Sequence, residues 1–248
     1  MFGKNPIRKS ETHLNGATLA VQEVFYTLQG EGPHAGEPAV FIRLAGCNLA
    51  CSFCDTEFES GIDKRLTVEQ IVTQVKAFPH HQLVVLTGGE PLRQNIKPLL
   101  KALSRGEGRE AVLLVQIETA GTLWVPDLER YIELGFVEIV CSPKTPKINP
   151  LIEQWCAHFK YVIRAGEQLT DGLPSGVYRT SVFSGNFLAT KPTIWVSPCD
   201  DHEIDLLGDI ATPYPSQKTQ LNVQVATQAA MQHGYRLTLQ MHKLVNLP

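Results

Sequence analysis

Short apolar runs alternate along this chain with segments whose apolar residues recur at helical spacing. The apolar runs predict strands at 38–46, 83–91, 111–121, 136–144, 159–165 and 192–200, with a last strand at 235–244. The periodic segments predict helices at 66–78, 93–104, 125–135 and 217–234. A strand–loop–helix unit repeated about six times is typical of a parallel α/β fold. Because a complete eight-unit barrel is tight in 248 residues, we expect a partial, open parallel (β/α) barrel.

Local signals mark the ends of two of these helices. Thr67 and Gln70 occupy the positions of a capping box, just before the apolar positions of the 66–78 helix. Gly234 ends the 217–234 helix, because glycine accepts the backbone conformation that commonly closes a helix.

The domain organisation is simple. Residues 1–16 are polar and predict a flexible N-terminal arm. Residues 17–248 predict a single domain. Within it, residues 166–190 contain four glycines and no clear period, so we expect an irregular insertion there.

The composition is that of an ordinary globular protein, with 43% hydrophobic and 19% charged residues. A net charge of -3 argues against a general nucleic-acid binder, which usually carries a basic surplus. No apolar run approaches the ~18 residues that span a bilayer, and the polar N-terminus lacks the apolar core of a secretory signal. We therefore expect a cytoplasmic protein with no nucleic-acid or membrane partner. In that compartment clustered cysteines more often bind metal or do redox chemistry than form disulfides.

Polar or Gly/Pro clusters follow five of the expected strands: GCNLAC, TGGEP, ETAGT, CSPK and SPCD. In parallel α/β folds the active site lies at the carboxyl ends of the strands. The candidate functional residues fall at that end of the sheet.

Cys47, Cys51 and Cys54 form a C-x3-C-x2-C motif with two interpretations. One is structural zinc, which takes four ligands in a closed tetrahedron. The remaining cysteines are scattered singly, and recruiting His34 fits no familiar zinc spacing. The other is a cubane iron–sulfur cluster held by three thiolates, which leaves one iron open to a ligand or substrate. The spacing by itself leaves both interpretations open.

The C-x3-C-x2-C motif directly after a strand, followed by GGEP at the end of the next strand, resembles the radical S-adenosylmethionine (SAM) superfamily. The resemblance implies an open barrel of the radical SAM type, with a 4Fe–4S cluster on the three cysteines and SAM on the open iron. Residues of the GGE type would bind the methionine ammonium. Gly88 and Gly89 suit this role because they let backbone carbonyls approach a ligand, and Glu90 adds complementary charge.

Further motifs resemble one branch of that superfamily, the 7-carboxy-7-deazaguanine synthases. They are FYTLQGEG, PAVFIRLAGCN, CDT, LTGGEPL, IETAGT, SPK and the C-terminal QMHKLVNLP, and they run in order from about residue 20 to the end. The resemblance implies ring contraction of 6-carboxy-5,6,7,8-tetrahydropterin with loss of ammonia, in queuosine and deazapurine biosynthesis. It also implies a flavodoxin or ferredoxin reductant and a homodimer.

The same resemblance assigns expected roles to residues, with the chemistry itself carried by the cluster and SAM. Thr56 would bind Mg²⁺, a hard cation that prefers oxygen. The expected cofactor contacts are Phe53, Cys54, Asp55, Gly88, Gly89, Glu90, Glu118, Ser142, Pro143, Lys144, Ser197 and Asp200. The expected substrate contacts are Leu28, Gln29, Gly30, Glu31, Arg43, Thr87 and Pro248, the last through the C-terminal carboxylate.

Two alternatives remain at this point. An activating enzyme for a glycyl-radical partner shares C-x3-C-x2-C and a similar length, but it acts on a protein. A zinc-stabilised, non-catalytic α/β binding protein would use the cysteines for structure only.

Overall fold

The computed structural model describes residues 5–54, 56–105, 111–180, 191–201, 216–245 and 247. Within them the strands join one sheet in the order β3-β1-β2-β4-β5-β6-β7-β8-β9. Their bounds are β1 (Thr18–Leu28), β2 (Pro38–Leu44), β3 (Arg65–Thr67), β4 (Leu83–Gly88), β5 (Leu114–Thr119), β6 (Val137–Cys141), β7 (His158–Ile163), β8 (Thr193–Pro198) and β9 (Arg236–Leu237). The helices are α1 (Val68–Lys76), α2 (Lys97–Leu103), α3 (Leu128–Glu133), α4 (Pro150–Trp155), α5 (Gln217–His233) and α6 (Met241–Leu244), with short 3-10 turns η1 (Gly32–His34) and η2 (Pro91–Arg93).

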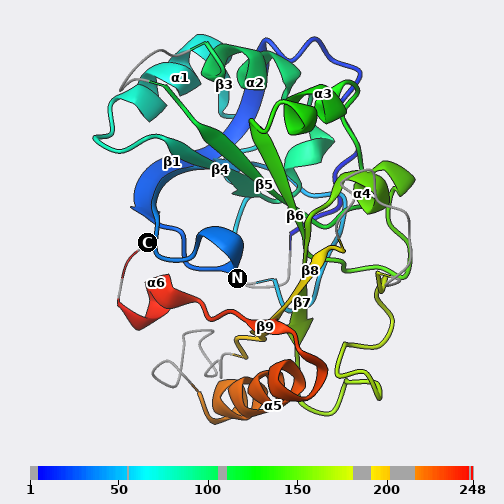
Figure 1. The fold of residues 1–248 in the computed structure, drawn as a ribbon. Helices are drawn as coiled ribbons and strands as arrows, with labels where there is room; N and C mark the ends of the chain where they lie inside the picture. Colours follow the sequence, from blue (N-terminus) through cyan, green and yellow to red (C-terminus); the bar gives the residue numbers. More distant parts are fainter. Residues whose placement is uncertain are drawn as a thin grey trace.

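Along the sheet order β2-β4-β5-β6-β7-β8-β9 each strand runs parallel to the next. In Figure 1 the sheet curves as an open barrel, with α1, α2 and α3 grouped outside one end and α5 at the other. The expectation of a partial, open parallel barrel is confirmed. The sheet has one antiparallel edge, because β1 pairs antiparallel with both β2 and β3.

Side-chain alternation along the strands separates two faces. On β2, Val40, Ile42 and Leu44 are fully buried in the main hydrophobic core, together with apolar residues of α1 and α2. Phe41 and Arg43 point the opposite way, into the interior of the curved sheet. The main core therefore lies between sheet and helices, and the interior face carries a smaller apolar cluster around Phe41 together with polar side chains such as Arg43.

The local helix signals are confirmed. The Thr67 side chain accepts from Gln70 N at 3.1 Å, and the Gln70 side chain accepts from Thr67 N at 2.9 Å. Gly234 ends α5 with φ of 74°.

The predicted strand at 235–244 is wrong beyond its first residues. Only Arg236–Leu237 pair with β8, and α6 begins at Met241. The chain leaves the sheet because Met241 N donates to Gly30 O at 3.2 Å and Gly32 N donates to the Thr238 hydroxyl at 2.8 Å.

Three elements were missed by the sequence analysis: β1, β3 and α4. The register shift in β1 between Val21 and Glu23 interrupts the alternation that marks a strand. A signal for α4 was present, since Asn149 caps it by accepting from Leu151 N at 2.9 Å and Pro150 opens it.

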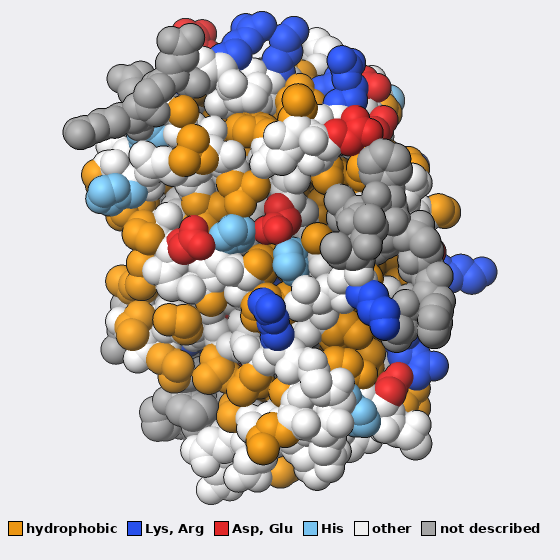
Figure 2. Space-filling model, viewed as in Figure 1, with side chains coloured by type: hydrophobic (Ala, Val, Ile, Leu, Met, Phe, Trp, Pro, Cys, Tyr) orange, Lys and Arg blue, Asp and Glu red, His pale blue; other side chains and the backbone are white. Residues whose placement is uncertain are grey.

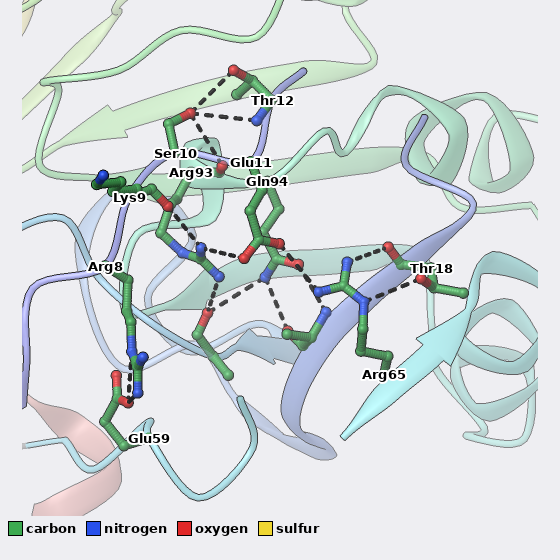
Figure 3. A network of polar contacts seen from close by, with 12 residues as sticks. Arg8, Lys9, Ser10, Glu11, Thr12, Thr18, Glu59, Arg65, Arg93 and Gln94 are labelled. Atoms are coloured by element: carbon green, nitrogen blue, oxygen red, sulfur yellow. Dashed lines mark hydrogen bonds and ion pairs between the residues drawn. The ribbon is translucent and has the colours of Figure 1, made fainter. Parts of the chain in front are cut away.

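The N-terminal residues differ from the expected flexible arm. Residues 5–16 lie against the body of the domain, fixed by a polar network in which Glu11 contacts both Arg65 and Arg93 (Figure 3). In the predicted insertion, residues 166–180 form turns without a helix or strand, and 181–190 lie outside the described residues. None of the described helices combines the length and apolar character that crossing a bilayer requires.

Candidate active site

A cavity of about 300 Å³ opens at the carboxyl ends of the strands. Its lining comes from β1, β2 and each parallel strand from β4 to β8, with Gln240 and His242 added by the C-terminal segment. The cavity therefore lies where the sequence analysis expected an active site.

The cysteine loop, residues 46–59, forms one wall. Cys47 follows the end of β2 directly, and Cys51 and Cys54 are joined by a turn in which Cys54 N donates to Cys51 O at 3.2 Å. All three cysteines line the cavity. Burial raises the pKa of Cys47 to about 12. Binding of a metal would therefore have to displace the proton of this thiol.

The glycines of the GGEP turn allow this turn to pack directly on the cysteine loop. Gly88 has φ of 123°, and a Cβ there would lie 2.1 Å from Leu44 O; a Cβ on Gly89 would lie 2.2 Å from Gly46 O. Gly89 N and Glu90 N donate to Leu44 O and Gly46 O, each at 3.1 Å. The backbone of the turn and the start of the cysteine loop are thus in contact, with no room for side chains.

This contact gives a stability prediction. We expect Gly88→Ala to destabilise the protein by about 3 kcal/mol, because the new Cβ meets backbone as well as an unfavourable φ. Gly36→Ala is the matched control: Gly36 also has a positive φ, of 91°, but a Cβ there would meet nothing within 4 Å. Urea unfolding of both variants tests this, and equal losses would show that the close packing is unimportant.

Glu90 does not line the cavity. Its side chain is fully buried and accepts from Leu92 N at 3.0 Å, the Thr119 hydroxyl at 2.8 Å and Ala120 N at 2.9 Å. Burial raises its pKa in spite of these hydrogen bonds. The carboxyl group joins the GGEP turn to the end of β5, which differs from the contact with a cofactor that the sequence analysis expected.

Lys160 on β7 forms the centre of a charged cluster inside the cavity. It is 7% exposed, pairs with a Glu31 oxygen and lies 4.0 Å from Glu118 Oε2. The second Glu31 oxygen accepts from the Ser197 hydroxyl at 2.9 Å. Glu118 Oε1 accepts from Gln29 Nε2 at 3.1 Å. Residues of β5, β7 and β8 are therefore held in one polar network with two residues that follow β1.

Two further cations face the same cavity. The Arg43 guanidinium lies 5.3 Å from the centre of the Phe25 ring, and its buried Nε makes no hydrogen bond although Glu23 Oε1 is 3.1 Å away. Lys144 Nζ donates to the Ser142 hydroxyl at 2.7 Å and lies 5.3 Å from the Phe53 ring centre. Burial, with a contribution from neighbouring Lys160, lowers the pKa of Lys144. Cationic groups on several walls suit a ligand that carries carboxylates.

A histidine–glutamate network anchors the segment that carries Gln29 and Glu31. His34 contacts Glu37 at 3.0 Å and Glu138 at 2.8 Å, and Glu138 contacts His158 Nε2 at 2.9 Å. The Trp195 indole, which can only donate, donates to His158 Nδ1 at 3.2 Å, which leaves His158 Nε2 as the nitrogen that donates a hydrogen bond to Glu138. Histidine and acidic side chains gather near the middle of one face of the molecule (Figure 2).

The network predicts a pH dependence of stability. Its hydrogen bond to Glu138 raises the pKa of His34 to about 9, so the stabilisation is complete below the unfolded pKa of 6.5 and lost as pH rises through 9. We expect a loss of about 2 kcal/mol, since His34 is partly exposed. Melting temperature should fall more steeply between pH 6.5 and 9.5 in wild type than in His34→Gln. The exposed control His80→Gln should follow wild type, and parallel wild-type and His34→Gln profiles would contradict the assignment.

The structure brings most of the expected site residues to this cavity. They are Leu28, Gln29, Glu31, Arg43, Cys47, Cys51, Phe53, Cys54, Thr56, Thr87, Gly88, Gly89, Glu118, Ser142, Lys144, Ser197 and Asp200. Gly30, Glu90 and Pro143 do not line the cavity, although Gly30 packs against His242, which does line it. Asp55 and Pro248 lie outside the described residues.

Sequence reasoning missed several lining residues, among them the polar residues Asn5, Thr27, Lys160, Gln240 and His242. A signal existed for Lys160, a lysine inside an apolar strand. Nothing in the local sequence marks Asn5.

Comparisons with known proteins agree with this geometry. The family model of the radical SAM superfamily matches residues 41–186. A 7-carboxy-7-deazaguanine synthase of Rhodospirillum rubrum is 44% identical over 253 residues, covering 100% of both chains. One from Bacteroides thetaiotaomicron is 44% identical over 92% of this chain and 97% of its own. The crystal structure of QueE from Escherichia coli superposes with a TM-score of 0.61 at 22% identity, covering 94% of this chain and 99% of that one, and supports the fold.

Proposed function

The chain belongs to the radical SAM superfamily and, within it, to the 7-carboxy-7-deazaguanine synthase family, and we propose from this membership how its cavity is used. It is an enzyme, a carbon–nitrogen lyase that contracts the ring of 6-carboxy-5,6,7,8-tetrahydropterin with loss of ammonia, a step of queuosine biosynthesis. The two alternatives, a glycyl-radical activating enzyme and a zinc-stabilised binding protein, are not favoured. One observation carries the proposal: the three cysteines line the same cavity as Gln29 and Glu31.

The cysteine loop fits a three-thiolate 4Fe–4S cluster. Cys47, Cys51 and Cys54 all line the same cavity, and each thiolate of a cubane binds a separate iron. When bound, the cluster and SAM supply the radical that starts the reaction.

The polar walls of the cavity would orient the two organic ligands. The backbone carbonyls of Gly88 and Gly89 would accept hydrogen bonds from the ammonium group of SAM. Lys144 and Ser142 would bind the carboxylate of SAM. Thr27 Oγ1 is buried in the lining without a hydrogen-bond partner among the described residues. An unsatisfied buried polar atom is costly, so this hydroxyl suits a contact with the polar pterin. Arg43 lines the same cavity; its Nε is paired with Glu23 Oε1 at 3.1 Å, and its guanidinium would also meet the substrate carboxylate.

We propose Thr56 as a ligand of Mg²⁺. It lies in the cavity lining two residues after Cys54, and its hydroxyl is of the type that Mg²⁺ prefers. When bound there, Mg²⁺ would supply positive charge to oxygen atoms of the substrate.

The remaining partners are also proposals. A flavodoxin or ferredoxin would supply electrons to the cluster, and the chain would form a homodimer. A cytoplasmic location suits the six cysteines, none of which forms a disulfide.

Anaerobic turnover tests the function. Purified protein reconstituted with iron and sulfide, then given the tetrahydropterin, SAM, Mg²⁺ and a reductant, should form the ring-contracted product and release ammonia. Near-equal iron and sulfide in brown protein would support the cluster. A colourless protein with one zinc would overturn it, and a loaded enzyme that leaves the pterin unchanged would overturn the substrate.

A further inference from the structure

The N-terminal segment, residues 5–11, runs along the cysteine loop. Ile7 pairs with Cys47 as a parallel bridge, and Arg8 N donates to Cys47 O at 2.7 Å. The backbone of the first cysteine is thus held by a segment that precedes every family motif noted in the sequence.

Asn5 holds the other end of the same loop. It is 8% exposed and lines the cavity. Its Nδ2 donates to Thr56 O at 2.8 Å and lies 3.9 Å from Cys54 Sγ, within hydrogen-bonding range for sulfur. Its Oδ1 accepts from Phe58 N at 3.5 Å. One amide therefore contacts the third cysteine and the backbone that follows it.

Two ion pairs anchor the segment. Arg8 donates to Glu59 Oε2 at 2.6 and 3.0 Å. Glu11 accepts from Arg93 Nη1 at 2.8 Å, and Arg93 is only 1% exposed. Arg93 also donates to Lys9 O at 2.9 Å and Ala45 O at 3.1 Å, so it links the segment to the strand end before Cys47 (Figure 3).

We propose that residues 5–11 position the three cysteines of the cluster and that Asn5 donates a hydrogen bond to the Cys54 sulfur. The inference rests on the proposed cluster. Hydrogen bonds to cluster sulfurs stabilise the more negative, reduced state and raise its reduction potential. Asn5 is thus a positioning residue that also tunes how readily the cluster is reduced.

Three variants of the reconstituted full-length protein separate these roles. Asn5→Leu removes the donor at similar volume, Arg8→Met removes one anchor without touching sulfur, and Asn15→Leu changes an exposed asparagine outside the cavity. The readouts are the reduction potential of the cluster, followed by its EPR signal, and the half-life of its absorbance with an iron chelator.

In Asn5→Leu the equilibrium constant for cluster reduction should fall about tenfold, which lowers the reduction potential by about 59 mV for one electron. This variant should also lose its cluster at least threefold faster. Arg8→Met should keep the wild-type potential but also lose the cluster faster, and Asn15→Leu should match wild type in both. A wild-type potential in Asn5→Leu overturns the hydrogen bond, and wild-type retention in Asn5→Leu and Arg8→Met overturns the positioning role. Wild-type protein that takes up no iron and sulfide would instead overturn the proposed function.

Discussion

Cys51→Ala is expected to take up little iron and to lose turnover completely, whereas Cys199→Ala should retain its cluster. Both cysteines line the cavity, so the structure alone offers Cys199 as a fourth thiol. Cys199 is 3% exposed, its Sγ lies 3.5 Å from Arg164 Nη2, and its backbone N donates to Ile163 O at 2.8 Å. These contacts indicate that Cys199 is a packed structural residue directly after β8. Iron and sulfide content after identical reconstitution, followed by anaerobic turnover, measures both expectations.

The Cys199 variant decides the form of the cluster. If Cys199→Ala lost iron as Cys51→Ala does, four thiolates would hold the cluster and no iron would be open to SAM. That result would contradict the proposed mechanism even though the motif is intact. Iron retention in Cys51→Ala at the wild-type level would contradict it from the other side.

The fold was predictable where its signals are local. The apolar run of β2 ends at the residue before Ala45 and the cysteine loop, and β4, β5, β6 and β8 are similar runs followed by polar clusters. The capping box of α1 and the glycine after α5 also depend only on neighbours in sequence. The end of the chain was misassigned because Met241 contacts Gly30, a residue far away in sequence.

The site was predictable as a set of motifs but not as a network. Glu90 belongs to a recognisable turn, yet its partner Thr119 comes from the next strand of the sheet, 29 residues later. Asn5 meets Cys54 across 49 residues and lies in a polar terminus that predicts no structure. Such pairings are set by the curvature of the sheet, which brings distant strand ends together and leaves no periodic trace in the sequence.

Lys160 is the clearest of these long-range residues, since its partner Glu31 lies 129 residues earlier. We expect Lys160→Met to lower kcat/KM by about 10²–10³-fold. Without the cation, Glu31 and Glu118 would face each other in a confined cavity, and breaking a buried ion pair by removing one partner typically destabilises the fold by about 3–5 kcal/mol. Their uncompensated negative charge would also repel a substrate that carries a carboxylate.

Steady-state kinetics of the reconstituted enzyme measure this effect, with Lys147→Met as the control because Lys147 is exposed and lies outside the cavity lining. Iron content checks that the cluster is intact in both variants. The double variant Lys160→Met/Glu31→Gln removes both charges of the pair, so it should regain thermal stability without regaining turnover. A pair with a purely structural role would recover thermal stability and turnover together. Recovery of turnover in the double variant would therefore show that the cation does not orient substrate. A kcat/KM of Lys160→Met within threefold of wild type would show the same.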